Sequence, residues 1–216
     1  MPTTRTRSER RAFLGTLATT AAVLGSGLAV PSSLEAMPAP DGSDTWLNGL
    51  KGTYKQVFDV YKPDEGYGLA YAHTFLATQG PKPDAGAVVV LRHAGFPLAL
   101  GDAVWKKYGI GKALGVVDPE TKAPAVRNPF LKPKPGVLLA DDMAIDRLLA
   151  RGVIFGACNV ALNVLSGRFA AGAGVTAAEA LKEWTAGIIP GITVIPSGVW
   201  GVNRAQVKGC TYCAAG

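Results

Sequence analysis

The strongest constraint on the fold is a set of short apolar runs that alternate with segments of helical spacing. Residues 87–93, Ala-Val-Val-Val-Leu-Arg-His, begin with five consecutive apolar side chains, and residues 153–157, Val-Ile-Phe-Gly-Ala, contain no polar side chain. A strand of this kind has both faces covered, which is typical of a parallel sheet between layers of helices. Residues 54–61 and 192–196 are rich in β-branched and aromatic residues and predict two further strands.

Helical patterns separate these strands along the chain. We expect helices over residues 63–79, 98–108, 140–150, 159–169, 176–187 and 199–207. Strands and helices in this order predict a three-layer α/β sandwich with a mostly parallel central sheet of about five strands, joined by right-handed crossovers.

Residues 115–136 interrupt this alternation, with five Pro and no periodicity. A loop of that length is usually functional or an insertion. We interpret it as a surface excursion, either a cover over the site or a plain insertion. The α/β domain is expected to span residues 51–209, after a linker at 37–50 and before a C-terminal tail at 210–216.

The first 36 residues have the organisation of an export signal, with four Arg ahead of a weakly apolar stretch. Arg10, Arg11, Phe13 and Leu14 resemble the twin-arginine (Tat) export motif. This resemblance implies a protein of the periplasm or cell envelope that meets the membrane only transiently, through its signal peptide. A transmembrane tether is the alternative, which the Thr, Ser and Gly residues within the stretch disfavour.

Charge and composition exclude several classes of protein. The net charge is +6, and the first 36 residues hold four Arg and two Glu, so only +4 remains on the rest of the chain. These charges are scattered, without the basic stripe that nucleic-acid binding requires. The chain is 48% hydrophobic and has three Cys, so it is neither disordered nor a disulfide-built scaffold.

Chemistry is expected at the carboxyl ends of the strands, where ligands bind in open parallel sheets. Cys158 comes directly after a strand and opens a helix with Asn159, so its sulfur is expected near the positive end of the helix dipole. His93 ends another strand at the same edge. These three residues are the candidate catalytic group, while a buried structural cysteine is the alternative for Cys158.

Three segments resemble the DsrE/DsrF-like family of sulfur-relay proteins. Residues 87–100 have a strand ending near His ahead of a Pro/Leu-rich helix, residues 153–162 a strand ending in a Cys that opens a helix, and residues 189–199 a Pro-Gly-Ile strand leading into Pro-Ser-Gly-Val. The resemblance implies a three-layer fold, a homo-oligomer, and a persulfide on Cys158. A sulfur donor or acceptor protein, or a small thiol, would then be the partner.

The sequence Cys210-Thr-Tyr-Cys213 near the C-terminus is the other candidate site. In an oxidising envelope its spacing favours a local disulfide. It could also act as a thiol pair that services Cys158, or hold zinc or copper together with His93 or, less favourably, His73. No cofactor is otherwise indicated.

Three functional hypotheses remain open from the sequence. In the first, Cys158 carries sulfur or shuttles thiol redox state. In the second, a non-catalytic envelope protein of the same fold binds a ligand or partner, with residues 115–136 involved. In the third, the C-terminal cysteines bind a metal. Whether the protein is an enzyme therefore stays undecided at this stage.

Overall fold

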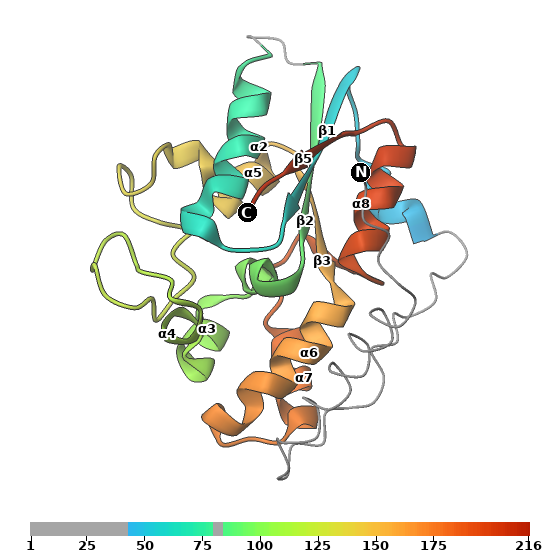
Figure 1. The fold of residues 1–216 in the computed structure, drawn as a ribbon. Coiled ribbons are helices and arrows are strands. Elements are labelled where there is room, and N and C mark those ends of the chain that lie inside the picture. Colours follow the sequence, from blue (N-terminus) through green and yellow to red (C-terminus); the bar gives the residue numbers. More distant parts are fainter. Residues whose placement is uncertain (1–42, 80–83) are drawn as a thin grey trace, which may run out of the picture. The chain divides into compact units, whose positions relative to one another are not determined.

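The computed structural model describes residues 43–79 and 84–216, and its centre is a sheet of five parallel strands (Figure 1). The strands are β1 (Tyr54–Val60), β2 (Ala85–Leu91), β3 (Ile154–Cys158), β4 (Ile192–Ile195) and β5 (Thr211–Ala214). They lie in the order β4-β3-β2-β1-β5, and every neighbouring pair is parallel. The predicted α/β sandwich with a parallel five-stranded sheet is confirmed. The export motif at residues 10–14 lies outside the described residues.

Helices cover both faces of the sheet, as the apolar runs predict. Helices α2 (Tyr67–Ala77) and α5 (Ile145–Ala150) lie on one side, and α8 (Gly198–Val207) lies on the other (Figure 1). Consecutive strand residues alternate between the two layers: Phe58 packs with the α2 side, whereas Val57 packs with the α8 side. Burial on both faces explains why the central strands carry so few polar residues.

The α8 layer also contains part of the segment that was expected to be a linker. Residues 43–47 form the short 3₁₀ helix η2 (Ser43–Leu47), whose Leu47 is buried against the α8 side of the sheet. Asp44 in η2 makes an ion pair with Arg204 of α8. The linker prediction is therefore wrong from residue 43 onward, because this apolar turn packs on the sheet.

The remaining helices lie mostly beyond the carboxyl edge of the sheet or beside its α2 face. They are η3 (Asp64–Gly66), η4 (His93–Ala99), α3 (Asp102–Tyr108), α4 (Ile110–Leu114), η5 (Asp141–Met143), α6 (Asn159–Ala170), η6 (Ala171–Ala173) and α7 (Ala177–Ala186). The helix predicted over 98–108 is split, because Leu100 is extended and forms an antiparallel bridge with Ile188. This bridge ties η4 to the segment after α7.

The C-terminal segment expected to be a tail is the edge strand of the sheet. Strand β5 pairs with β1 from Gln56 to Asp59, and the N–H of Ala215 donates to the carbonyl of Asp59. The prediction of a tail at residues 210–216 is therefore wrong, since this segment completes the sheet.

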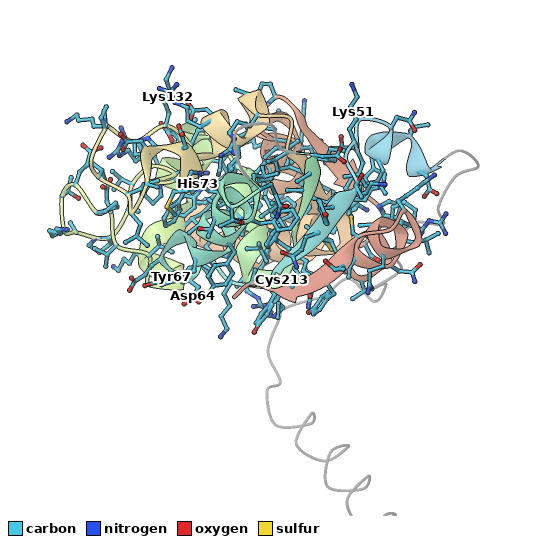
Figure 2. The ribbon with its side chains drawn as sticks, turned by 90° about the horizontal axis from the view of Figure 1, so that it is seen from above. Lys51, Asp64, Tyr67, His73, Lys132 and Cys213 are labelled. Carbon is cyan, nitrogen blue, oxygen red and sulfur yellow. The ribbon has the colours of Figure 1, made fainter. Side chains whose placement is uncertain are left out.

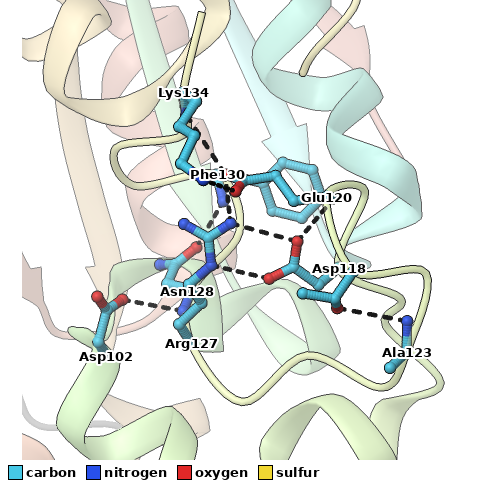
Figure 3. A network of polar contacts seen from close by, with 9 residues as sticks. Asp102, Asp118, Glu120, Ala123, Arg127, Asn128, Phe130 and Lys134 are labelled. Carbon is cyan, nitrogen blue, oxygen red and sulfur yellow. Dashed lines mark hydrogen bonds and ion pairs between the residues drawn. The ribbon is translucent and has the colours of Figure 1, made fainter.

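Residues 115–136 have little regular structure but are held firmly to the domain (Figure 3). Arg127 makes ion pairs with Asp118 and Glu120, and the side-chain N–H groups of the buried Asn128 donate to the carbonyls of Leu98 and Leu100. Burial raises the pKa of Asp118, but the hydrogen bonds from Arg127 and the backbone outweigh it and leave the pKa lowered. The insertion is therefore a fixed part of the structure.

The docking of this insertion on α4 can be tested at a glycine. A Cβ at Gly111 would lie 2.1 Å from the carbonyl oxygen of Ala125, whereas one at Gly172 would meet nothing within 4 Å. We expect Gly111→Ala to lower the free energy of unfolding by about 1–3 kcal/mol, because the insertion backbone must shift. Gly172→Ala should be neutral or stabilise by up to about 1 kcal/mol. Urea unfolding measures both, and equal stabilities of the two variants would contradict the close contact.

Candidate functional site

An ion pair between the buried Asp59 and the partly exposed Arg92, together with a hydrogen bond from Tyr212, joins three neighbouring strands at the carboxyl edge of the sheet. Asp59, near the end of β1, is 3% exposed and accepts hydrogen bonds from Arg92 Nε at 2.6 Å and Arg92 Nη2 at 2.8 Å. Arg92 follows β2 directly, and Tyr212 of β5 donates its hydroxyl to Asp59 Oδ2 at 3.0 Å. The carboxylate is therefore satisfied from both adjacent strands, which fixes the position of the guanidinium.

The electrostatics of this group keep Arg92 charged and Tyr212 protonated. The hydrogen bonds to Asp59 raise the pKa of Arg92 above its ordinary value, with burial opposing and the charges of Asp59, Tyr212 and Cys158 adding to the rise. Burial, followed by the hydrogen bond to Asp59, raises the pKa of Tyr212. The guanidinium also lies 5.4 Å from the centroid of the Tyr61 ring, at cation–π distance.

Cys158 lies beside this ion pair, at the junction of strand and helix where the sequence places it. Leu91 and Ala157 are partners in the parallel pairing of β2 and β3, so Arg92 and Cys158 are the next residues on adjacent strands. The sulfur of Cys158 caps α6 and accepts a hydrogen bond from the backbone N–H of Ala161 at 3.3 Å. The residue is only 6% exposed. The sulfur therefore lies at the N-terminal end of α6, where a backbone N–H is directed at it.

A glycine allows Arg92 to lie where it does. A Cβ at Gly198, the first residue of α8, would come within 2.5 Å of Arg92 Cβ. The absence of a side chain there lets the aliphatic part of Arg92 pass the beginning of α8.

Among the described residues, no hydrogen bond joins the sulfur to either of the other two candidate catalytic residues. The side-chain amide of Asn163 donates to the backbone and side-chain oxygens of Asn159, which holds Asn159 on the helix. His93 lines a separate cavity whose wall does not include Cys158. Asp59 and Arg92 were missed by the sequence analysis, although an acidic residue inside an apolar strand is a usable signal.

The two C-terminal cysteines do not form a disulfide, which corrects that expectation. Both thiols are free and pack on opposite faces of the sheet: Cys210, just before β5, packs with the α8 layer, and Cys213 of β5 packs with the α2 layer. Burial raises the pKa of Cys210 to about 11 and also raises the pKa of Cys213. Neither thiol is thereby prepared for attack on a sulfur at Cys158.

The proposed combination of these cysteines with a histidine for zinc or copper is not formed either. Across residues 43–79 and 84–216, no three His, Cys, Asp or Glu side chains lie close enough together to hold a metal ion. His73 lies on α2, with its Nδ1 3.1 Å from Nη1 of Arg151.

A cavity of about 1030 Å³ lies between the loop after β1 and the insertion. One wall consists of residues 61–67, and the opposite wall comes from residues 114–122 and 137–139, with Phe130 and His93 also lining it. Asp64 and Tyr67 lie close to one another on the first wall (Figure 2). The insertion therefore forms one wall of this cavity.

Comparisons with known proteins leave the function open. No model of a known family matches the chain, and no curated protein matches it. Among solved structures, MTH1491, a protein of unknown function from Methanobacterium thermoautotrophicum, is similar at 17% identity with a TM-score of 0.41, over 74% of this chain and 98% of that one. A similarity at that level carries no argument about function. None of the helices in the described ranges is long and apolar enough to cross a membrane.

The ion pair at the carboxyl edge makes a testable contribution to stability. We expect Asp59→Asn to lower the free energy of unfolding by about 1–3 kcal/mol, because the partly exposed guanidinium of Arg92 loses its anionic partner. The matched control is Lys107→Gln, which breaks the exposed Lys107–Glu183 pair and should change stability little. Chemical unfolding measures both variants. Similar losses for the two would show that the Asp59 pair is no more important than a surface contact.

Proposed function

We propose that this protein carries sulfur as a persulfide on Cys158, as its resemblance to the DsrE/DsrF-like family implies. The observation that carries the proposal is the position of the Cys158 sulfur, which accepts the Ala161 N–H at the start of α6 beside the charged Arg92. A persulfide reacts as its anion, and a backbone N–H at the start of a helix can donate a hydrogen bond to that anion.

The transfer step balances with a donor persulfide, R–S–SH, as the only co-reactant. The Cys158 thiolate attacks the outer sulfur of the donor, and a new S–S bond forms while the S–S bond of the donor breaks. The bonding electrons leave with the donor sulfur as a thiolate, which takes up the proton released from Cys158. The products are Cys158–S–SH and R–SH, with no net change in oxidation state.

The ion pair with Asp59 gives Arg92 its role as a positioning residue. Asp59 engages Nε and Nη2 of the guanidinium and leaves Nη1 out of the pair. A planar group held by two parallel hydrogen bonds keeps a fixed orientation, which a lysine ammonium would not reproduce. A fixed positive charge beside Cys158 stabilises the anion both before and after transfer.

The burial of Cys158 limits the kind of donor that the proposal includes. Only 6% of the residue is exposed, so a bulky donor could not approach the sulfur closely. This favours a small thiol persulfide or inorganic polysulfide over a bulky protein donor. We further propose, from the export motif at Arg10 and Arg11 and from the family resemblance, that the protein acts as a homo-oligomer in the periplasm or cell envelope.

The intact mass of the protein after treatment with inorganic polysulfide tests the proposal. We expect wild type to gain about 32 Da in an adduct that reductant removes. Cys213→Ser should retain this gain and Cys158→Ser should lose it, although Cys213 is the more exposed thiol. Thermal unfolding of each variant checks that it is folded. A gain that persists in Cys158→Ser, or one that is lost in Cys213→Ser, would overturn the assignment to Cys158.

A further inference from the structure

We infer that the cavity between residues 61–67 and the insertion binds a small amphipathic anion, a molecule with an apolar or aromatic body and one anionic group. This site lies apart from the proposed sulfur chemistry, since Cys158 is not among the residues that line it. The inference rests on backbone conformation, exposed apolar side chains and charge, which are independent observations.

Strained backbone is concentrated at this cavity. Four non-glycine residues in the described parts of the chain have positive φ: Asp64 at 35°, Glu65 at 54°, His93 at 48° and Lys122 at 58°. All four line the cavity, although they come from three separate segments. L-residues adopt such conformations rarely, and those that do are concentrated at ligand and active sites.

The walls of the cavity expose apolar side chains to solvent. Leu139 is 77% exposed, Val117 is 53% exposed and Tyr67 is 39% exposed, and all three line the cavity. The buried side chains of Val116 and Phe130 continue this apolar surface. Concave sites lined in this way bind the apolar part of a small molecule.

Two lysines at the cavity are available to an anionic group on that molecule. Lys62 and Lys122 come from two segments, and neither makes an ion pair with any described residue. The two acidic lining residues, Asp64 and Glu65, are consecutive and lie just before α2, where the helix dipole favours negative charge. The cations therefore remain available to a ligand.

Two fluorescent probes that share one apolar body test this inference on the folded protein. 1-Anilinonaphthalene-8-sulfonate carries a sulfonate, and N-phenyl-1-naphthylamine lacks it. We expect the sulfonate probe to saturate one site per chain. It should bind about fivefold more tightly than the neutral probe, because an exposed ion pair contributes about that much to an affinity.

Variants distinguish the contribution of the lysines to probe binding from that of the apolar wall. Lys62→Gln and Lys122→Asn should each weaken the sulfonate probe by about twofold and leave the neutral probe unchanged. Asn is chosen at residue 122 because it tolerates the positive φ there. Leu139→Ser should weaken both probes. Lys112→Gln, an exposed residue of α4 that does not line the cavity, is the matched control and should change neither.

The outcomes distinguish this site from the proposed sulfur chemistry. Cys158→Ser should bind both probes as wild type does, so failure of one proposal leaves the other standing. The absence of saturable binding, equal affinity for the two probes, or an equal effect of Lys112→Gln and Lys62→Gln would overturn the inference. Each variant, measured without probe, should have the same thermal unfolding midpoint as wild type. A change in probe binding is then not caused by unfolded protein.

Discussion

A carboxylate buried in an apolar sheet lowers stability unless its charge and hydrogen-bonding capacity are satisfied, and Asp59 is such a group. Arg92 from β2 and Tyr212 from β5 satisfy it, so one side chain connects three parallel strands at their carboxyl ends. The same contact holds a guanidinium next to Cys158. The reactive character that we assign to Cys158 therefore depends on an interaction two strands away.

The sheet presents two different environments at this edge. At the end of β3, a nearly buried sulfur accepts a backbone N–H at a helix N-terminus, which is the site of the proposed sulfur chemistry. Beyond β1, a cavity is closed on one side by residues 115–136, which is the site of the proposed binding. The hydrogen bonds of Asn128 to Leu98 and Leu100 hold that wall against the domain. The two proposed sites are thus separate on one scaffold.

The layers of the fold could be predicted because both faces of β2 and β3 are buried, which leaves continuous apolar runs in the sequence. The position of Cys158 followed from the same runs. Strand β5 could not be predicted, since its four residues are too few for a pattern and depend on pairing with Gln56–Asp59, far away in the chain. The Asp59–Arg92 contact likewise requires the order of the strands, which local patterns do not contain. The position of His93 in the cavity wall likewise could not be predicted, since it follows from a left-handed backbone turn, where φ is 48°.

The rate at which iodoacetamide labels each cysteine of the native protein tests the central claim most directly. Mass spectrometry of the resulting peptides gives a separate rate for Cys158 and Cys213. The account predicts that Cys158 reacts faster despite its greater burial, and that Arg92→Gln slows it by about tenfold while Cys213 is unaffected. Labelling of Cys158 only after denaturation, or at a rate that Arg92→Gln leaves unchanged, would contradict it.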